Sequence, residues 1–125
     1  MSKQQPPGLT RLVKAFKYSM QGFKAGFANE AAIRQEFALS AVLTALAFVL
    51  SDSVTELILL IALPWLTVAF ELLNSAIEAV VDRIGPQWHE LSGRAKDLGS
   101  ACVFVLLCLT CFGWAAVLLS KVYAP

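Results

Sequence analysis

The sequence predicts an all-α membrane protein, with one amphipathic helix on the membrane surface followed by three helices that span the bilayer. Hydrophobic residues make up 58% of the 125 residues, and only 15% are charged. Ordinary soluble domains contain roughly 45–50% apolar residues. The mean hydropathy is +0.67. A small soluble domain has a large surface to cover with polar groups, and this chain has too few of them. We therefore expect a single membrane-embedded domain over residues 1–125.

The first expected helix covers residues 9–29 and is amphipathic. At about 100° per residue, its apolar side chains fall within one stripe of roughly 100°, namely Leu9, Leu12, Val13, Phe16, Met20, Phe23 and Phe27. Lysine and arginine side chains lie beside or opposite this stripe. A basic helix with phenylalanine on its apolar face suits the plane of a membrane interface. It does not suit DNA, because the basic residues are sparse and no partner motif follows.

Three apolar segments follow, at residues 31–50, 54–84 and 98–120. A bilayer core of ~30 Å needs about 20 helical residues, so each segment is long enough to span it. Pro64 in the second segment removes one backbone hydrogen bond from its helix. The three cysteines all fall in the last segment, at Cys102, Cys108 and Cys111. Their odd number and apolar surroundings indicate small apolar side chains rather than a disulfide framework or a metal site.

The basic residues predict the orientation of the chain in the membrane. Only Lys121 lies on one expected side, and the other nine of the ten lie on the opposite side, at Lys3, Arg11, Lys14, Lys17, Lys24, Arg34, Arg83, Arg94 and Lys96. The positive-inside rule assigns that side to the cytoplasm. Three spans then place the N-terminus in the cytoplasm and the C-terminus outside. The net charge of +1 gives no indication of nucleic-acid binding.

A stripe of polar side chains lies within the second apolar segment. On a helix, one arc of about 100° contains all five of its members, which are Glu71, Asn74, Ser75, Glu78 and Asp82. An unpaired carboxylate in hydrocarbon costs roughly 2.5–3.5 kcal/mol on insertion scales. The stripe must therefore face protein, water or ions. A seam that only packs helices together is one alternative, but two glutamates favour a functional site.

Depth along the helix separates the two glutamates. Glu78 lies about 10 Å from Glu71 along the helix axis. The outer carboxylate could hold Mg²⁺ together with a phosphate, and the inner one could take a proton from a hydroxyl in the lipid. The next segment, HELSGRAKDLGS, is expected to be a loop whose cations suit a polyphosphate. It has no P-loop spacing, and a solvated loop that follows the positive-inside rule is the alternative interpretation.

Two motifs resemble the signature of the prokaryotic diacylglycerol kinases, which are small integral membrane lipid kinases. They are ELLNSAIEAVVDRIG at residues 71–85 and WHELSGRAKDLGSA at residues 88–101. The stretch TRLVKAFKYSMQGFKAGFANEAAIRQE, residues 10–36, is similar to the N-terminal region of that family. The resemblance implies a homotrimeric bundle in the bacterial inner membrane. It also implies transfer of the γ-phosphate of ATP, as the Mg²⁺ complex, to the free hydroxyl of diacylglycerol, which gives phosphatidate.

The resemblance implies roles for the residues that match the family's motifs. Glu71 matches the general base, and Glu30 and Glu78 match the ligands of the Mg²⁺ that accompanies the nucleotide. Positions that match contacts to ATP are Arg11, Tyr18, Glu30, Glu78, Gln87, Trp88, His89, Lys96 and Asp97. Positions that match contacts to the lipid substrate are Arg11, Arg34, Glu36, Glu71, Asn74 and Ser100.

Three other functions also fit the acids of this polar stripe, which we call the acid stripe. An undecaprenol kinase would use the same mechanism and shares the E-x-x-N-x-x-x-E pattern, although NEAAIRQE and HELSGRAKD are closer to the diacylglycerol type. A non-enzymatic ion-conducting or proton-relay oligomer would also need intramembrane acids, but it gives no reason for a cationic segment beside them. A protein that only assembles through a polar seam would not depend on Glu71 for activity.

Overall fold

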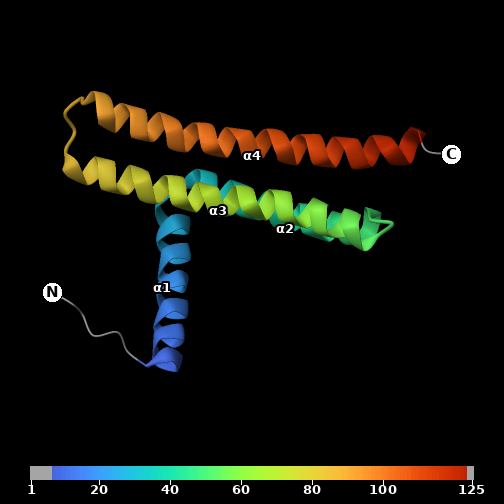
Figure 1. Ribbon diagram of the computed structural model, residues 1–125, viewed down its shortest axis with the longest axis horizontal. Helices are drawn as coiled ribbons and strands as arrows, with labels where there is room; N and C mark the ends of the chain where they lie inside the picture. The colour runs from blue at the N-terminus through green and yellow to red at the C-terminus, as the bar shows by residue number, and fades with distance from the viewer. Residues whose placement is uncertain (1–6, 124–125) are drawn as a thin grey trace.

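The computed structural model describes residues 7–123, and it contains four helices over this range. They are α1 (Gly8–Asn29), α2 (Ala31–Leu50), α3 (Val54–Ile84) and α4 (Glu90–Tyr123). In Figure 1, α2, α3 and α4 lie side by side and alternate in direction, whereas α1 projects sideways from this bundle. No strand occurs within residues 7–123. Lys3, which the orientation argument includes, lies outside the described residues.

Three helices, α2, α3 and α4, are long and apolar enough to cross a membrane. This confirms the prediction of an all-helical chain with three such helices. Their outward faces carry large apolar side chains, such as Phe48, Phe104 and Phe112. Few apolar side chains are buried between the helices in comparison. Such a surface suits lipid as the solvent, since lipid tails are as apolar as the side chains themselves.

The start of α4 corrects one expectation from the sequence. Residues 89–100 are expected to be a loop, but α4 begins at Glu90 and runs through this segment without a break. The first turn closes through the N–H of Gly93, which donates to the carbonyl of His89 at 3.0 Å. The N–H of Leu91 donates to His89 Nδ1 at 3.0 Å, which satisfies a second amide of this helix end. The connection between α3 and α4 is therefore only residues 85–89.

The connection between α2 and α3 is fixed by a capping arrangement. Ser53 Oγ accepts a hydrogen bond from the N–H of Glu56 at 3.1 Å, and the Glu56 carboxylate accepts one from the N–H of Asp52 at 2.9 Å. Such reciprocal bonds satisfy the unpaired amides at a helix start. Lys121 Nζ lies 2.5 Å from Asp52 Oδ2 and 3.0 Å from Glu56 Oε2. This lysine therefore joins the end of α4 to the α2–α3 turn.

The proline inside α3 is compensated by a tryptophan from α4. Pro64 has no N–H to donate to the carbonyl of Leu60, four residues earlier. The indole N–H of Trp114 donates to this carbonyl at 3.1 Å, and both residues belong to a buried cluster with Ala47 and Val117. An unpaired carbonyl inside a bilayer would cost several kcal/mol, about as much as any buried polar group. The contact thus satisfies α3 and fixes α4 against it.

Other hydroxyl and indole groups connect the three long helices. Trp65 Nε1 donates to Thr44 Oγ1 at 2.8 Å between α3 and α2. The hydroxyl oxygens of Thr67 and Thr110 lie 3.2 Å apart between α3 and α4. Thr67 lies one helical turn before Glu71 on the same face of α3. These contacts therefore fix the rotation of α3 about its own axis, so that Glu71 faces the neighbouring helices.

Candidate functional site

The polar stripe of α3 becomes more exposed towards the end of the helix. Glu71 and Asn74 are buried, Ser75 and Glu78 are half-buried, and Asp82 is exposed. The deepest acid of the stripe is thus enclosed by protein rather than directed outward. This is the arrangement expected of carboxylates on an otherwise apolar helix, where they must face protein or polar groups.

Carboxyl groups gather around Glu71 from α2, α3 and the α1–α2 junction. The Glu36 carboxyl group of α2 faces that of Glu71 within hydrogen-bonding reach. Glu30, at the junction, and Glu78, on α3, lie close enough to interact electrostatically with Glu71. Glu36 Oε2 is buried, and no described residue hydrogen-bonds to it. Such a concentration of negative charge between low-dielectric walls favours a cationic ligand.

Asn74 lies between the two glutamates of α3. Its Nδ2 donates to Glu78 Oε1 at 3.5 Å, and its side chain also interacts with the Glu71 carboxyl group. Its Oδ1 is buried, and it has no hydrogen-bond partner among the described residues. The amide thus orients both carboxylates from one position, with its NH₂ group towards the acids and its oxygen towards α4.

The four carboxyl groups of Glu30, Glu36, Glu71 and Glu78 form an acid cluster. This acid cluster fits a metal ion that is bound together with a nucleotide. Within residues 7–123, no group of three or more His, Cys, Asp or Glu side chains is arranged to hold a metal ion by itself. Mg²⁺ in nucleotide enzymes is usually held by one or two carboxylates together with phosphate oxygens and water. Glu30 and Glu78 each interact electrostatically with Glu71, so the cluster offers two carboxylates for such a site. The donor set therefore suits Mg²⁺ that is shared with phosphates.

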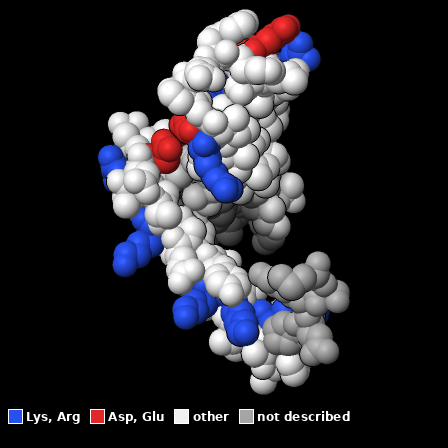
Figure 2. All heavy atoms as spheres, turned by 90° about the vertical axis from the view of Figure 1, so that its left-hand side faces the viewer, with Lys and Arg blue, Asp and Glu red and all other residues white. Residues whose placement is uncertain are grey.

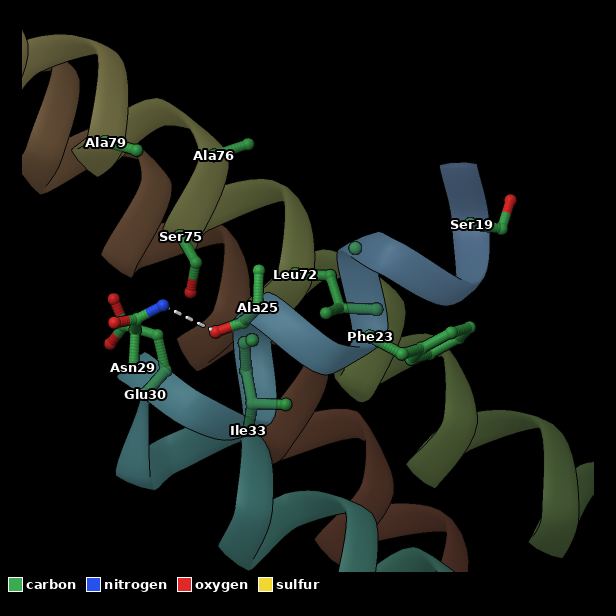
Figure 3. Close-up of a pocket in the computed structure, with 12 residues that line it drawn as sticks. Ser19, Phe23, Ala25, Asn29, Glu30, Ile33, Leu72, Ser75, Ala76 and Ala79 are labelled. Atoms are coloured by element: carbon green, nitrogen blue, oxygen red, sulfur yellow. Dashed lines mark hydrogen bonds between the residues drawn. The ribbon is translucent and has the colours of Figure 1, made fainter. Parts of the chain in front are cut away.

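A pocket of about 530 Å³ opens between α1, the start of α2 and α3 (Figure 3). Glu30 and Ser75 form its polar edge, while Phe23, Ile33 and Leu72 provide apolar walls. Asn29 Nδ2, on the same polar edge, donates to the carbonyl of Ala25 at 2.8 Å. Leu72 and Ser75 lie one and four residues after Glu71, so the pocket adjoins the acid cluster. Apolar walls with a few polar groups suit a molecule that carries both hydrocarbon and polar parts.

Charged side chains also pair at the end of the bundle where α3 and α4 are joined. Lys96 Nζ lies 2.6 Å from Asp82 Oδ1, and Arg94 Nη2 lies 3.4 Å from Glu90 Oε1. Lys96 also interacts electrostatically with Glu78, which links this end to the acid cluster. Figure 2 looks onto this end and shows acidic and basic groups on the bundle, with basic groups along α1, whose sequence contains no acid.

The remaining predicted site residues are not gathered at the acid cluster of one chain. Arg11 and Tyr18 precede Glu30 on α1 by about 28 Å and 18 Å along the helix axis. Arg34 is exposed, and its Nη1 donates to the carbonyl of Phe27 at 2.6 Å. The other residues of this group are exposed in the α3–α4 connection or on α4, and they are Gln87, Trp88, His89, Asp97 and Ser100.

Sequence reasoning missed two parts of the site. The pocket is lined by three separate helices, and no motif connects them. Gly99, whose backbone packs against Asn74 Oδ1, lies inside the motif RAKDLGS but offers no chemical group of its own. A glycine in an apolar helix often marks a close approach to a neighbouring helix. That signal could have identified Gly99, although not its partner.

Known proteins match the chain over most of its length. Residues 17–118 match a family model described as prokaryotic diacylglycerol kinase. The chain is 52% identical over 111 residues to a protein named diacylglycerol kinase from Haemophilus influenzae, which covers 89% of this chain and 94% of that protein. A protein of the same name from Pseudomonas aeruginosa is 49% identical over 112 residues, covering 90% and 91%. One from Escherichia coli is 46% identical over 113 residues, covering 90% and 93%.

Proposed function

The chain belongs to the prokaryotic diacylglycerol kinase family, and from this premise we propose that it transfers the γ-phosphate of ATP to the free hydroxyl of diacylglycerol. The product is phosphatidate, and the reaction takes place in a bacterial inner membrane. The observation that carries the proposal is the cluster of the buried Glu71 with the half-buried Glu30, Glu36 and Glu78, beside a pocket with apolar walls and a polar edge. A phosphate acceptor that is itself a lipid suits such a pocket.

Glu71 is the general base of the proposed reaction. It accepts the proton of the lipid hydroxyl as that oxygen attacks the γ-phosphorus. A new phosphorus–oxygen bond forms to the lipid, the bond between the γ-phosphorus and the bridging oxygen breaks, and ADP leaves. Phosphoryl transfer asks the protein mainly for positioning and electrostatic stabilisation. The burial of Glu71 beside Leu72 and Ser75, which line the pocket, supports this role.

The nucleotide is held from both ends of the acid cluster. Glu30 and Glu78 would hold Mg²⁺ with the phosphates, and the bound ion supplies positive charge that neutralises the phosphate oxygens. Lys96, which interacts with Glu78, adds an ammonium group on the same side. The residues proposed to contact the rest of ATP are Gln87, Trp88, His89 and Asp97 in the open α3–α4 connection and the start of α4, with Arg11 and Tyr18 from α1.

The lipid enters from the membrane interface. We propose that α1 lies in the plane of this interface on the cytoplasmic side, with its basic residues towards water and phospholipid headgroups. The lipid hydroxyl then reaches Glu71 near Glu36 and Asn74. Arg34 and Ser100, both exposed, contact the more polar part of the substrate.

A homotrimer would complete the site. The distance of Arg11 and Tyr18 from Glu30 along α1 leaves them remote from the acids of their own chain. A neighbouring copy can bring its α1 to an adjacent acid cluster. This supports a site shared between subunits of the trimer.

The proposal is tested with purified protein in lipid vesicles, supplied with Mg²⁺ and ATP labelled at the γ-phosphate. Diacylglycerol and undecaprenol are offered in separate reactions. We expect label in phosphatidate. Label only in undecaprenyl phosphate would keep the mechanism and change the substrate. Folded protein that transfers no label to either lipid would contradict a kinase, and it would favour ion conduction or helix packing as the purpose of the acid stripe.

A further inference from the structure

We propose that Gly99 is a positioning residue of the site, which keeps the Asn74 amide in the orientation that serves Glu71 and Glu78. This inference rests on the proposed function, because its effect on the reaction is exerted through those two carboxylates. Gly99 has no polar side chain and touches neither acid itself. Its contribution is the space that a side chain would otherwise fill.

The contact between Gly99 and Asn74 has no room for a methyl group. A Cβ atom built on Gly99 would overlap Asn74 Oδ1 and would lie 3.1 Å from its Cγ. Both residues are buried, and Asn74 is only 7% exposed. The amide oxygen therefore occupies the volume that the Cβ of any other residue would need.

The hydrogen-bonding groups determine which way the amide points. A carboxylate only accepts hydrogen bonds, so the NH₂ group of Asn74 must face Glu78 and the oxygen must face α4. The wall around this oxygen is apolar, with Phe70, Leu98 and Cys102 lining the adjoining groove. There the oxygen meets the hydrogen that Gly99 carries in place of Cβ, a weak contact of the kind found where helices approach closely.

A methyl group at position 99 would therefore displace the amide. Asn74 must rotate, or α3 and α4 must separate. Either change withdraws the NH₂ group from Glu78 and from the Glu71 carboxyl group. A misplacement of about 1 Å in a catalytic arrangement can cost on the order of a hundredfold in rate. Gly99→Ala should thus behave like the loss of Asn74 itself.

Two other glycines of α4 provide matched controls. A Cβ on Gly93 would meet nothing within 4 Å, so Gly93→Ala adds a methyl group in open space. A Cβ on Gly113 would meet Leu63 of α3, far along the bundle from the acids. Gly113→Ala therefore reports on crowding between α3 and α4 without any change at the site.

The experiment is a double-mutant cycle of Gly99→Ala and Asn74→Ala, with the two control variants, in the full-length protein. For each variant, kcat and the KM for ATP with diacylglycerol are measured, together with the unfolding temperature. We expect Gly99→Ala to lower kcat by at least about tenfold and to add no further loss to Asn74→Ala. The double variant should pack without strain, because the two Cβ atoms would lie 3.8 Å apart, an ordinary contact. Gly93→Ala and Gly113→Ala should keep the wild-type kcat.

The cycle has clear contrary outcomes. A Gly99→Ala protein that keeps wild-type kcat, or losses that multiply in the double variant, would overturn the inference. If Gly99→Ala alone does not fold, the double variant must fold, and its failure would overturn the inference as well. A wild-type protein that leaves diacylglycerol unphosphorylated would refute the proposed function instead. The unfolding temperatures would still decide whether positions 74 and 99 are coupled.

Discussion

Glu71 and Asn74 are polar side chains buried in an otherwise apolar helix, and each has a polar neighbour within hydrogen-bonding reach. Glu36 and Asn74 are such neighbours of Glu71, and Asn74 also donates to Glu78. Glu30 and Glu78 place further carboxylates near Glu71. Two buried oxygens, Glu36 Oε2 and Asn74 Oδ1, have no hydrogen-bond partner among the described residues. Orphaned buried groups usually mark a functional constraint or an absent ligand. Here they lie within the proposed phosphoryl-transfer site.

Lys96 offers a test at the residue scale. Its Nζ lies 2.6 Å from Asp82 Oδ1, and its charge also interacts electrostatically with Glu78. A charged hydrogen bond to phosphate contributes enough that Lys96→Met should lower kcat/KM for ATP by at least about tenfold. Asp82→Asn, the matched variant, releases the lysine and should not weaken ATP use. Steady-state kinetics at varied ATP decide this, and equal losses in both variants would show that the ion pair is only structural.

Periodicity predicted the acid stripe, because all its members lie on one helix and their spacing alone fixes a common face. The approach of Glu36 to Glu71 and of Gly99 to Asn74 could not be predicted in this way. Each joins two helices, and it depends on which faces meet and how closely. Glu30 was predicted as a site residue only through the family resemblance, because it lies far from Glu78 in the sequence.

At the scale of the helices, α3 and α4 are held together by a hydrogen bond that a proline makes necessary. Trp114→Phe should destabilise the protein by about 1 kcal/mol or more, because the Leu60 carbonyl loses its donor. In the Pro64→Ala background the alanine N–H replaces that donor, so the same change should cost much less. Trp65→Phe, which removes the bond to Thr44, is the control and should cost the same in both backgrounds. Unfolding in mixed micelles gives the four differences in free energy, two for each tryptophan, and an equal cost of Trp114→Phe in both backgrounds would refute the compensation.

The order of the helices was predictable, because three long apolar segments leave few alternative assignments. The start of α4 was not, because its first turns carry polar and charged residues that resemble a loop. Several of them, namely Glu90, Arg94 and Lys96, are good helix formers, and Gly99 of this segment packs against Asn74 of α3. The consequence is functional, since a helix fixes Lys96 and Asp97 more firmly than a loop would.

At the scale of the whole molecule, the described residues form a bundle of three helices that are long and apolar enough to cross a membrane, with α1 as one arm. The projection of α1 from the bundle forms a corner (Figure 1). Glu30, at the α1–α2 junction, lines a pocket there with Leu72 and Ser75 of α3. The outward faces of the bundle are apolar, and the basic arm suits an interface. The number of subunits could not be read from composition or periodicity, because one chain does not display how its apolar faces are covered.

The central claim is that the buried Glu71 is the general base of phosphoryl transfer. The variant Glu71→Gln tests this claim most directly. Glutamine keeps the shape of the side chain and one acceptor oxygen, but it cannot accept a proton at catalytic rates. Glu90→Gln, on the exposed first turn of α4, is the control. Turnover of diacylglycerol should fall by at least about a hundredfold in Glu71→Gln, with an unchanged unfolding temperature and wild-type turnover in the control. A Glu71→Gln protein that keeps most of its turnover would contradict the assignment of Glu71 as the base.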